Sequence, residues 1–243
     1  MIINSKSKIA ISLLIVMLLV LVFNIGAVIY ATTDGSGTLG SSGITWTYTA
    51  EDKTLVISAT EGSGVMPDYT SSNKPPFSGK GFTKVIIEEG VTSIGKYTFY
   101  DNRNIESVEI ASTVKVISDY AFQGYGDKSK LSTIIGMEGV ETIGKFAFEG
   151  SKITELNVPS LLAVGDNAFS SIYSGTSSNQ TLVSVNAPNL TTVGKEAFYN
   201  QDNLTTFYAP NLTSIGERAF EGSEDLTDLT IGQSAIIGLF AFK

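Results

Sequence analysis

One phrase recurs seven times between Phe82 and the end of this 243-residue sequence, and it constrains the fold more than any other feature. The phrase begins with an aliphatic residue, which is usually followed by Gly. Three further residues and then Phe complete it. Its copies end at Phe99, Phe122, Phe148, Phe169, Phe198, Phe220 and Phe242. Gly follows the aliphatic residue in every copy except one, which has Ser118, and Ala precedes Phe in every copy except the first, which has Thr98. Self-similarity at a period of roughly 20 to 50 residues is typical of stacked repeats, so we predict a solenoid of about seven repeats over residues 82–243.

A second pattern precedes each phrase. It has three apolar residues, with two residues of any type between the first and second and one between the second and third. Its copies are Phe82/Val85/Ile87, Ile105/Val108/Ile110, Ile153/Leu156/Val158, Leu182/Val185/Ala187, Leu204/Phe207/Ala209 and Leu226/Leu229/Ile231, with a weaker one at Leu131/Ile134/Gly136. The last two positions lie on one face of a short strand because they are two residues apart. We therefore predict that each repeat has a short strand, a turn, and a compact helical or 3₁₀ turn carrying Ala-Phe. Stacking would place the strands in a parallel sheet, about 4.8 Å apart, with the Phe rings in a ladder inside the opposite wall.

Residues 32–81 are expected to form a polar linker and a cap on the first repeat. Ile44–Tyr48 alternates apolar and polar residues, and Thr54–Ser58, with Leu55 and Ile57, follows a turn as the returning strand, which predicts a β-hairpin. A solenoid needs a terminal unit that covers its core, and Trp46, the sole Trp of the chain, would anchor this one. The Gly-, Ser- and Pro-rich stretch 62–81 is expected to be a connecting loop.

The first 31 residues have the composition of a targeting segment. Lys6 and Lys8 precede an apolar run that continues, with an interruption at Asn24, to the small residue Ala31. This order predicts a secretory signal peptide over residues 1–31. An uncleaved membrane anchor is the alternative, because the run approaches the roughly 20 residues that span a bilayer. Either interpretation predicts that the rest of the chain is secreted or at the cell surface.

Composition argues against several functional classes. The chain has no Cys and no His, which excludes disulfides, thiol chemistry, Cys/His metal sites and His-based triads. Its formal net charge of −8 disfavours nucleic acid as a partner, because phosphates require clustered Lys and Arg. Asp and Glu are scattered, and the sequence contains neither a Gly-rich phosphate loop nor a calcium-binding loop pattern. We expect no enzymatic activity and no cofactor.

The repeat phrases resemble those of a known family. Val-Thr-Ser-Ile-Gly-Lys-Tyr-Thr-Phe at 91–99 and Leu-Thr-Ser-Ile-Gly-Glu-Arg-Ala-Phe at 212–220 are similar to the repeat of BspA-type leucine-rich-repeat proteins. The resemblance covers residues 82–243 and extends to the cap. It implies a protein secreted or displayed on the surface of bacteria or some protists, with a role in adhesion or host-protein binding. The chain departs from the family in lacking Cys, and we expect no closing cap after Phe242.

The strand residues between the buried positions form the candidate binding surface. They are expected to line one face of the sheet, and the resemblance places that face on the inner curve of a leucine-rich-repeat arc. Its central column is Ile86, Glu109, Ile135, Asn157, Asn186, Tyr208 and Thr230. Exposed apolar residues among polar neighbours can mark a recognition site, although a solvated sheet face with no partner is the alternative.

Two repeats carry extra residues after their Phe, and these provide further candidates. The insertions contain Tyr125 and Tyr173, and both follow the same point of the repeat. Insertions in repeat arrays form loops that often lie near the binding face, although long surface loops also cost little stability when neutral. Four Asn-x-Ser/Thr sequons begin at Asn179, Asn189, Asn203 and Asn211, and a turn role is favoured for them over glycosylation.

Two functional hypotheses follow from this pattern. In the first, the strand face binds an extracellular protein or glycan, including one of host origin. In the second, the chain is a structural or assembly element that associates with itself through the last repeat, where Phe242 would otherwise meet water. The membrane would be contacted only through the N-terminal segment, if that segment is not cleaved.

Overall fold

The computed structural model describes residues 34–60, 64–124, 128–171 and 181–243. The chain divides into Met1–Thr32 and a compact unit, Thr33–Lys243, and the described core belongs entirely to the second unit. The predicted signal peptide or anchor therefore lies outside the described residues, as do Tyr125, Tyr173 and Asn179. Among the residues described, no helix has the length and apolar character needed to cross a membrane.

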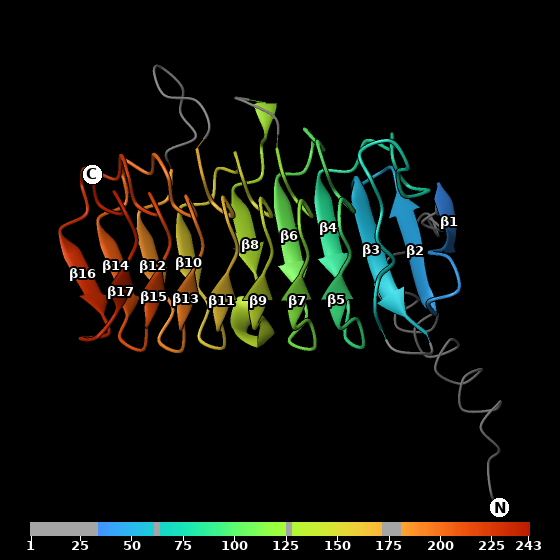
Figure 1. Cartoon of the computed structure of the whole chain (residues 1–243). Coiled ribbons are helices and arrows are strands. Elements are labelled where there is room, and N and C mark those ends of the chain that lie inside the picture. The colour runs from blue at the N-terminus through green and yellow to red at the C-terminus, as the bar shows by residue number, and fades with distance from the viewer. Residues whose placement is uncertain (1–33, 61–63, 125–127, 172–180) are drawn as a thin grey trace, which may run out of the picture. The chain divides into compact units, whose positions relative to one another are not determined.

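Three strands begin the compact unit: β1 (Gly35–Thr38), β2 (Ile44–Thr49) and β3 (Thr54–Ala59). β2 pairs antiparallel with both of the others, and its pairing with β3 forms the hairpin at the predicted position. β1 was not predicted, because Gly35, Ser36 and Gly37 lack the side chains that reveal a strand. β3 pairs in parallel with the first repeat strand, so the hairpin continues the sheet of the repeats (Figure 1).

The predicted repeat strands are present and parallel, and we call them the long-strand wall. They are β4 (Lys84–Ile87), β6 (Ser107–Ile110), β8 (Thr133–Ile135), β10 (Glu155–Asn157), β12 (Ser184–Asn186), β14 (Thr206–Ala209) and β16 (Asp228–Ile231). This wall is divided into two sheets. A six-stranded sheet joins β1, β2 and β3 to β4, β6 and β8, and a four-stranded sheet holds β10, β12, β14 and β16.

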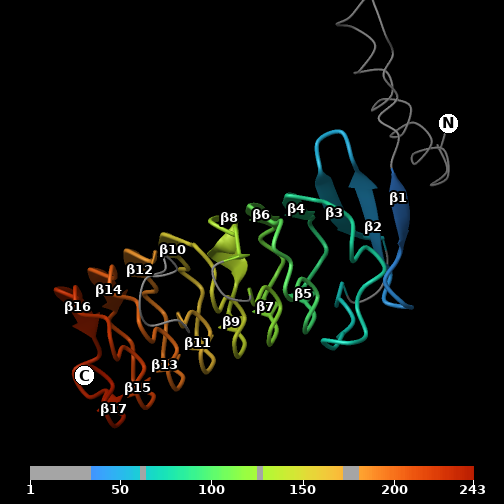
Figure 2. The ribbon, with the colours of Figure 1, turned by 90° about the horizontal axis from the view of Figure 1, so that it is seen from above.

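A second wall, the short-strand wall, was not predicted. It is one seven-stranded sheet of two-residue strands, each ending at the aliphatic residue of a repeat phrase. Its strands are β5 (Ser93–Ile94), β7 (Val116–Ile117), β9 (Thr142–Ile143), β11 (Ala163–Val164), β13 (Thr192–Val193), β15 (Ser214–Ile215) and β17 (Ile236–Ile237). Figure 2 shows both walls following the same stack of coils. Two residues are too few to display an alternating pattern, so these strands can be recognised only from their neighbours in the stack.

The Phe ladder inside the stack is confirmed. Successive rings from Phe99 to Phe242 lie 4.9–5.4 Å apart between centroids, with interplanar angles of 1–12°. The rings from Phe99 to Phe220 are buried, whereas Phe242 in the last coil is 41% exposed. Each coil thus buries its aromatic ring against the next, which is why one repeat cannot be stable alone.

The helical or 3₁₀ turn expected around Ala-Phe is not what forms there. Two successive β-turns form instead: the amide of Ala147 donates to Gly144 O, and that of Glu149 donates to Phe146 O. Phe146, the second central residue of the first turn, has a φ of 57°, and its equivalents in the other six repeats have a φ between 55° and 61°. A left-handed residue at this position is typical of a type II turn and cannot continue a right-handed helix.

Candidate binding site

The predicted central column lies where the alternation of each strand places it. In β4, Val85 and Ile87 are buried in the core, so Ile86 between them faces outward. The ladder register aligns Ile86 with Glu109 and Ile135, and it aligns Asn157 with Asn186, Tyr208 and Thr230. The structure therefore brings the seven residues together on one face, as two aligned groups rather than one.

The members of the column differ in how much surface they offer. Ile135 is 53% exposed and Tyr208 is 43% exposed, whereas Ile86 and Glu109 are half-buried. In the second group, Asn186 Nδ2 donates to Asn157 Oδ1 at 2.8 Å, so these two amides form a short ladder across neighbouring strands. The exposed apolar surface is thus concentrated at Ile135 and Tyr208, one in each group.

The break between the two groups originates at Gly136. This residue occupies the inward-facing column that holds Ile110 in the preceding strand, and its φ is 84°. A Cβ there would overlap the carbonyl oxygen of Ile110, so the backbone passes closer than any side chain would allow. The chain then enters the 3₁₀ helix η2 (Met137–Gly139), in which the buried Met137 fills the core. β8 ends after three residues, and β10 begins the next sheet.

A hollow lies on the long-strand wall beside this irregular coil. It lies at the ends of β4, β6 and β8, has a volume of about 580 Å³ and is open to solvent. Its apolar lining includes Ile86 and Ile135, and its charged lining consists of Glu88, Glu89 and Glu109. Ile86, Glu109 and Ile135 were predicted as site residues, whereas Glu88 and Glu89 were not. These two follow the end of β4, outside the alternating stretch from which the column was predicted.

Two rows on the turn edge were missed altogether. The residue after each Gly or Ser of the phrase alternates in charge, as Lys96, Asp119, Lys145, Asp166, Lys195 and Glu217, and Lys145 Nζ lies 2.7 Å from an Asp166 carboxylate oxygen. The residue that follows forms the second row, which begins as an aromatic stack. The ring centroids of Tyr97 and Tyr120 are 4.6 Å apart, and those of Tyr120 and Phe146 are 5.0 Å apart. Comparing equivalent positions down the seven copies would have revealed both rows.

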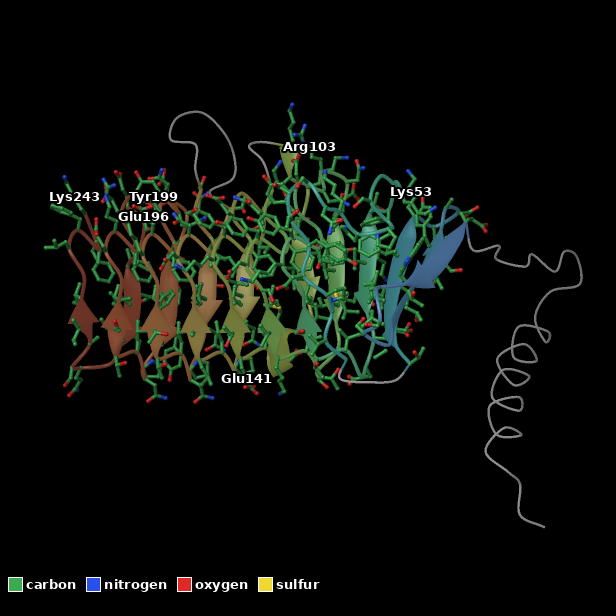
Figure 3. The ribbon with its side chains drawn as sticks, turned by 45° about the vertical axis from the view of Figure 1, so that its right-hand side comes forward. Lys53, Arg103, Glu141, Glu196, Tyr199 and Lys243 are labelled. Carbon is green, nitrogen blue, oxygen red and sulfur yellow. The ribbon has the colours of Figure 1, made fainter. Side chains whose placement is uncertain are left out.

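The aromatic stack gives way to polar contacts in the later coils. The guanidinium of Arg218 pairs with Glu221 at 2.7 Å, lies 3.7 Å from Glu196, and sits over the ring of Tyr199. Figure 3 shows Glu196 and Tyr199 on one edge of the array and Glu141 on the opposite edge. The contacts of Arg218 with Glu196 and Tyr199 link adjacent coils, so this row has a structural role of its own.

A buried carboxylate lies directly after the Phe ladder. Glu149 is 3% exposed and accepts hydrogen bonds from Gln123 Nε2 and from Ser170 Oγ, the latter at 3.2 Å. Burial raises the pKa of Glu149 to about 7, and the two hydrogen bonds oppose that shift only in part. The three residues occupy equivalent positions in successive coils, so they form a buried polar ladder beside the two insertions.

The last coil exposes several large apolar side chains. Ile236 is 75% exposed and Leu239 is 73% exposed, and Leu239 takes the place of the alternating charges. Phe240 is 57% exposed at the end of the turn row. The sequence analysis singled out only Phe242 here, and the exposed apolar surface of this coil extends beyond that residue.

Two of the four sequons have a visible structural role. Asn189 Nδ2 donates to the carbonyl oxygen of Pro159 at 2.8 Å, and Asn211 Nδ2 donates to that of Pro188 at 2.9 Å. Each amide thus ties its turn to the preceding coil, as the turn interpretation requires. Within the described part of the chain, no group of three or more Asp and Glu residues is arranged to hold a metal ion.

A family comparison agrees with the repeat geometry. The model of the BspA type leucine rich repeat region matches residues 68–176 and 170–243, in six copies. The chain belongs to this family. The matched region includes all seven Phe phrases and extends before β4, into the loop that follows the hairpin.

Solved structures of leucine-rich proteins from other organisms show the same fold. The leucine-rich-repeat protein of T. pallidum is 21% identical, with a TM-score of 0.54, over 84% of this chain and 86% of that one. A leucine-rich cell surface protein of Faecalibacterium prausnitzii is 24% identical, with a TM-score of 0.57, over 84% of this chain but 56% of that one. No curated protein matches the sequence significantly.

Proposed function

We propose that this protein is a non-catalytic binding protein, secreted or held at the cell surface, that recognises an extracellular protein or glycan through its long-strand wall. The observation that carries the proposal is the exposure of Ile135 and Tyr208 on a face whose other strand residues are mostly polar. Exposed apolar surface rimmed by polar residues can mark a site of interaction with another molecule. Family membership supports the same proposal, as does the cell-surface description of the F. prausnitzii protein.

The architecture favours binding because its parallel strands present outward-facing residues in aligned rows. Ladder hydrogen bonds fix the backbone of each strand, so little backbone entropy is lost when the face meets a partner. The surface also offers no pair of facing acid and base groups on the column. We therefore propose that the partner is retained rather than transformed, and that it is not a nucleic acid, since the chain is acidic.

An array of extracellular proteins and glycans tests this function. The unit 33–243 and its variants Ile135→Asp and Tyr208→Asp would be compared for retention on the array. Thr142→Asp is the matched control, because Thr142 is exposed on β9 of the other wall. We expect at least one of the two long-strand variants to weaken retention by about tenfold, while the control does not. If every ligand found binds both variants as well as the parent, the long-strand wall is not the site.

The exposed last coil favours a second candidate function, self-association. β16 and β17 are the final strands of their sheets, and Ile236, Leu239 and Phe240 extend the apolar surface around them. Free strand edges with apolar neighbours are templates for pairing with another chain. Light scattering on the 33–243 unit at rising concentration would reveal dimers that Ile236→Ser and Leu239→Ser abolish. A monomer at every concentration would exclude this candidate.

A further inference from the structure

The hollow beside η2 differs from the rest of the long-strand wall in shape. In most coils the inward column is filled by a branched or methyl side chain, such as Ile87 in β4 or Val158 after β10. Gly136 supplies none, and the strand that would continue the sheet past Ile135 stops. Next to this interruption, Ile135 is the most exposed large apolar residue of the predicted column.

The hollow also differs in charge. Glu88 and Glu89 follow β4, and Glu109 lies at the middle of the face on β6. Glu109 is paired with Lys84 at 2.5 Å, whereas Glu88 accepts from Ser58 Oγ and Glu89 accepts from the amide and hydroxyl of Ser112. Among the described residues, Glu88 and Glu89 have no Lys or Arg within ion-pair distance. The lining therefore carries an excess of negative charge next to an apolar floor.

These two properties define what would fit. A group entering the hollow must cover Ile86 and Ile135 and must bring positive charge to Glu88 and Glu89. A phosphate, a sulfated glycan or an acidic peptide would be repelled, and a neutral sugar would leave the carboxylates without a cation. A guanidinium can bind a carboxylate through two parallel hydrogen bonds, and its flat face can lie against apolar surface.

We propose that the hollow binds an extended segment of the protein partner in which an Arg lies next to an aliphatic or aromatic residue. The inference rests on the proposed binding function and specifies the partner chemistry at one part of the wall. The apolar side chain covers Ile135, and the guanidinium reaches Glu88 and Glu89. Serine hydroxyls already hold these two carboxylates, so they need little reorganisation when the cation arrives.

Fluorescence anisotropy with defined peptides tests the proposal on the 33–243 unit, whose core is self-contained. The probe is a labelled pentapeptide of sequence Leu-Arg-Leu-Arg-Leu, and the reference peptides replace either Arg with Glu or Leu with Ser. We expect saturable binding of the Arg peptide that weakens with added salt, because exposed charge pairs are screened. Each reference peptide should bind at least about tenfold more weakly.

Protein variants locate the peptide. The double variant Glu88→Gln with Glu89→Gln keeps the hydrogen-bond acceptors for Ser58 and Ser112 but removes both charges, and it should weaken the Arg peptide by about tenfold. Ile135→Ser should weaken it by a similar factor. Glu155→Gln is the matched control, since Glu155 is exposed on β10 of the same wall and outside the hollow. It should change the affinity by less than about twofold.

Three results would overturn the proposal. The first is a lack of saturable binding of the Arg peptide up to about 1 mM, and the second is equal binding of the Glu peptide. The third is an equal loss in Glu155→Gln, which would indicate attraction to the acidic protein as a whole. The array distinguishes failure of this proposal from failure of the proposed function. If Tyr208→Asp alone abolishes binding of a ligand, the long-strand wall recognises that ligand but the hollow does not take part.

Discussion

The rings of Phe220 and Phe242 lie 5.1 Å apart and only 1° from parallel, yet one is 1% exposed and the other 41%. The two residues occupy the same position in consecutive coils and make the same stacking contact. They differ because Phe220 has a ring on both of its faces, whereas Phe242 has one only on the side of Phe220. The energetic value of each Phe is therefore set by its place in the array.

Phe148→Ala should cost about 3 to 5 kcal/mol of unfolding free energy, because its ring is fully buried between Phe122 and Phe169. Phe242→Ala should cost about 1 kcal/mol, since much of that ring is already in water. Urea unfolding of the 33–243 unit measures both. A loss under about 1 kcal/mol for Phe148→Ala would mean that its ring does not support the core.

Glu149→Gln should stabilise the protein at pH 8 and leave it unchanged near pH 4.5. Burial raises the pKa of Glu149 to about 7 in the folded state, so between its unfolded value of 4.5 and pH 7 the folded state holds a proton that the unfolded state releases. Stability is therefore lost as the pH rises through this window, and Gln removes the loss because it never ionises.

The expected gain from Glu149→Gln at pH 8 is about 1 to 3 kcal/mol. Urea unfolding at pH 4.5, 6 and 8 would measure it, with Glu155→Gln as the exposed control. Tyr120, whose phenol feels the charge of Glu149, titrates far above this range because burial raises its pKa. A gain that is equal at pH 4.5 and pH 8 would show that ionisation of Glu149 is not responsible.

Gly136→Ala should destabilise the protein by about 2 to 4 kcal/mol, because the new Cβ would collide with the carbonyl oxygen of Ile110 as well as occupying a left-handed backbone. Gly40→Ala is the matched control. Gly40 also has a positive φ, but open space surrounds its Cβ position, so that change should cost about 1 kcal/mol. Thermal unfolding of both variants separates the collision from the backbone strain. Equal losses would show that the contact with Ile110 does not determine the cost.

Lys145→Ala should change the unfolding free energy only slightly, despite the 2.7 Å contact between its ammonium and Asp166. Both side chains are more than a third exposed, so water and salt screen the pair. Unfolding at low and high salt checks this, since the small difference from the parent should shrink as salt is added. A large loss that persists in high salt would indicate that the charged row contributes to the fold through packing.

Much of the candidate site was predictable because it depends on alternation within single strands. Val85 and Ile87 mark the inward face, so Ile86 had to face outward, and the same reasoning placed Ile135 and Tyr208 at the surface. The hollow was not predictable from that reasoning. Glu88 and Glu89 join it only because β4, β6 and β8 end side by side, and a single strand carries no information about where its neighbours end.

The repeat phrase by itself determined that the chain is a solenoid, that its strands are parallel and that its Phe rings stack, because a recurring spacing of apolar residues leaves one way to bury them all. Tertiary structure decided where that regularity fails. Gly136 is one more glycine in the sequence, but in the stack its backbone passes against Ile110, ends β8 and divides the wall. Contacts between residues one coil apart set such features, and these contacts exist only once the coils have stacked.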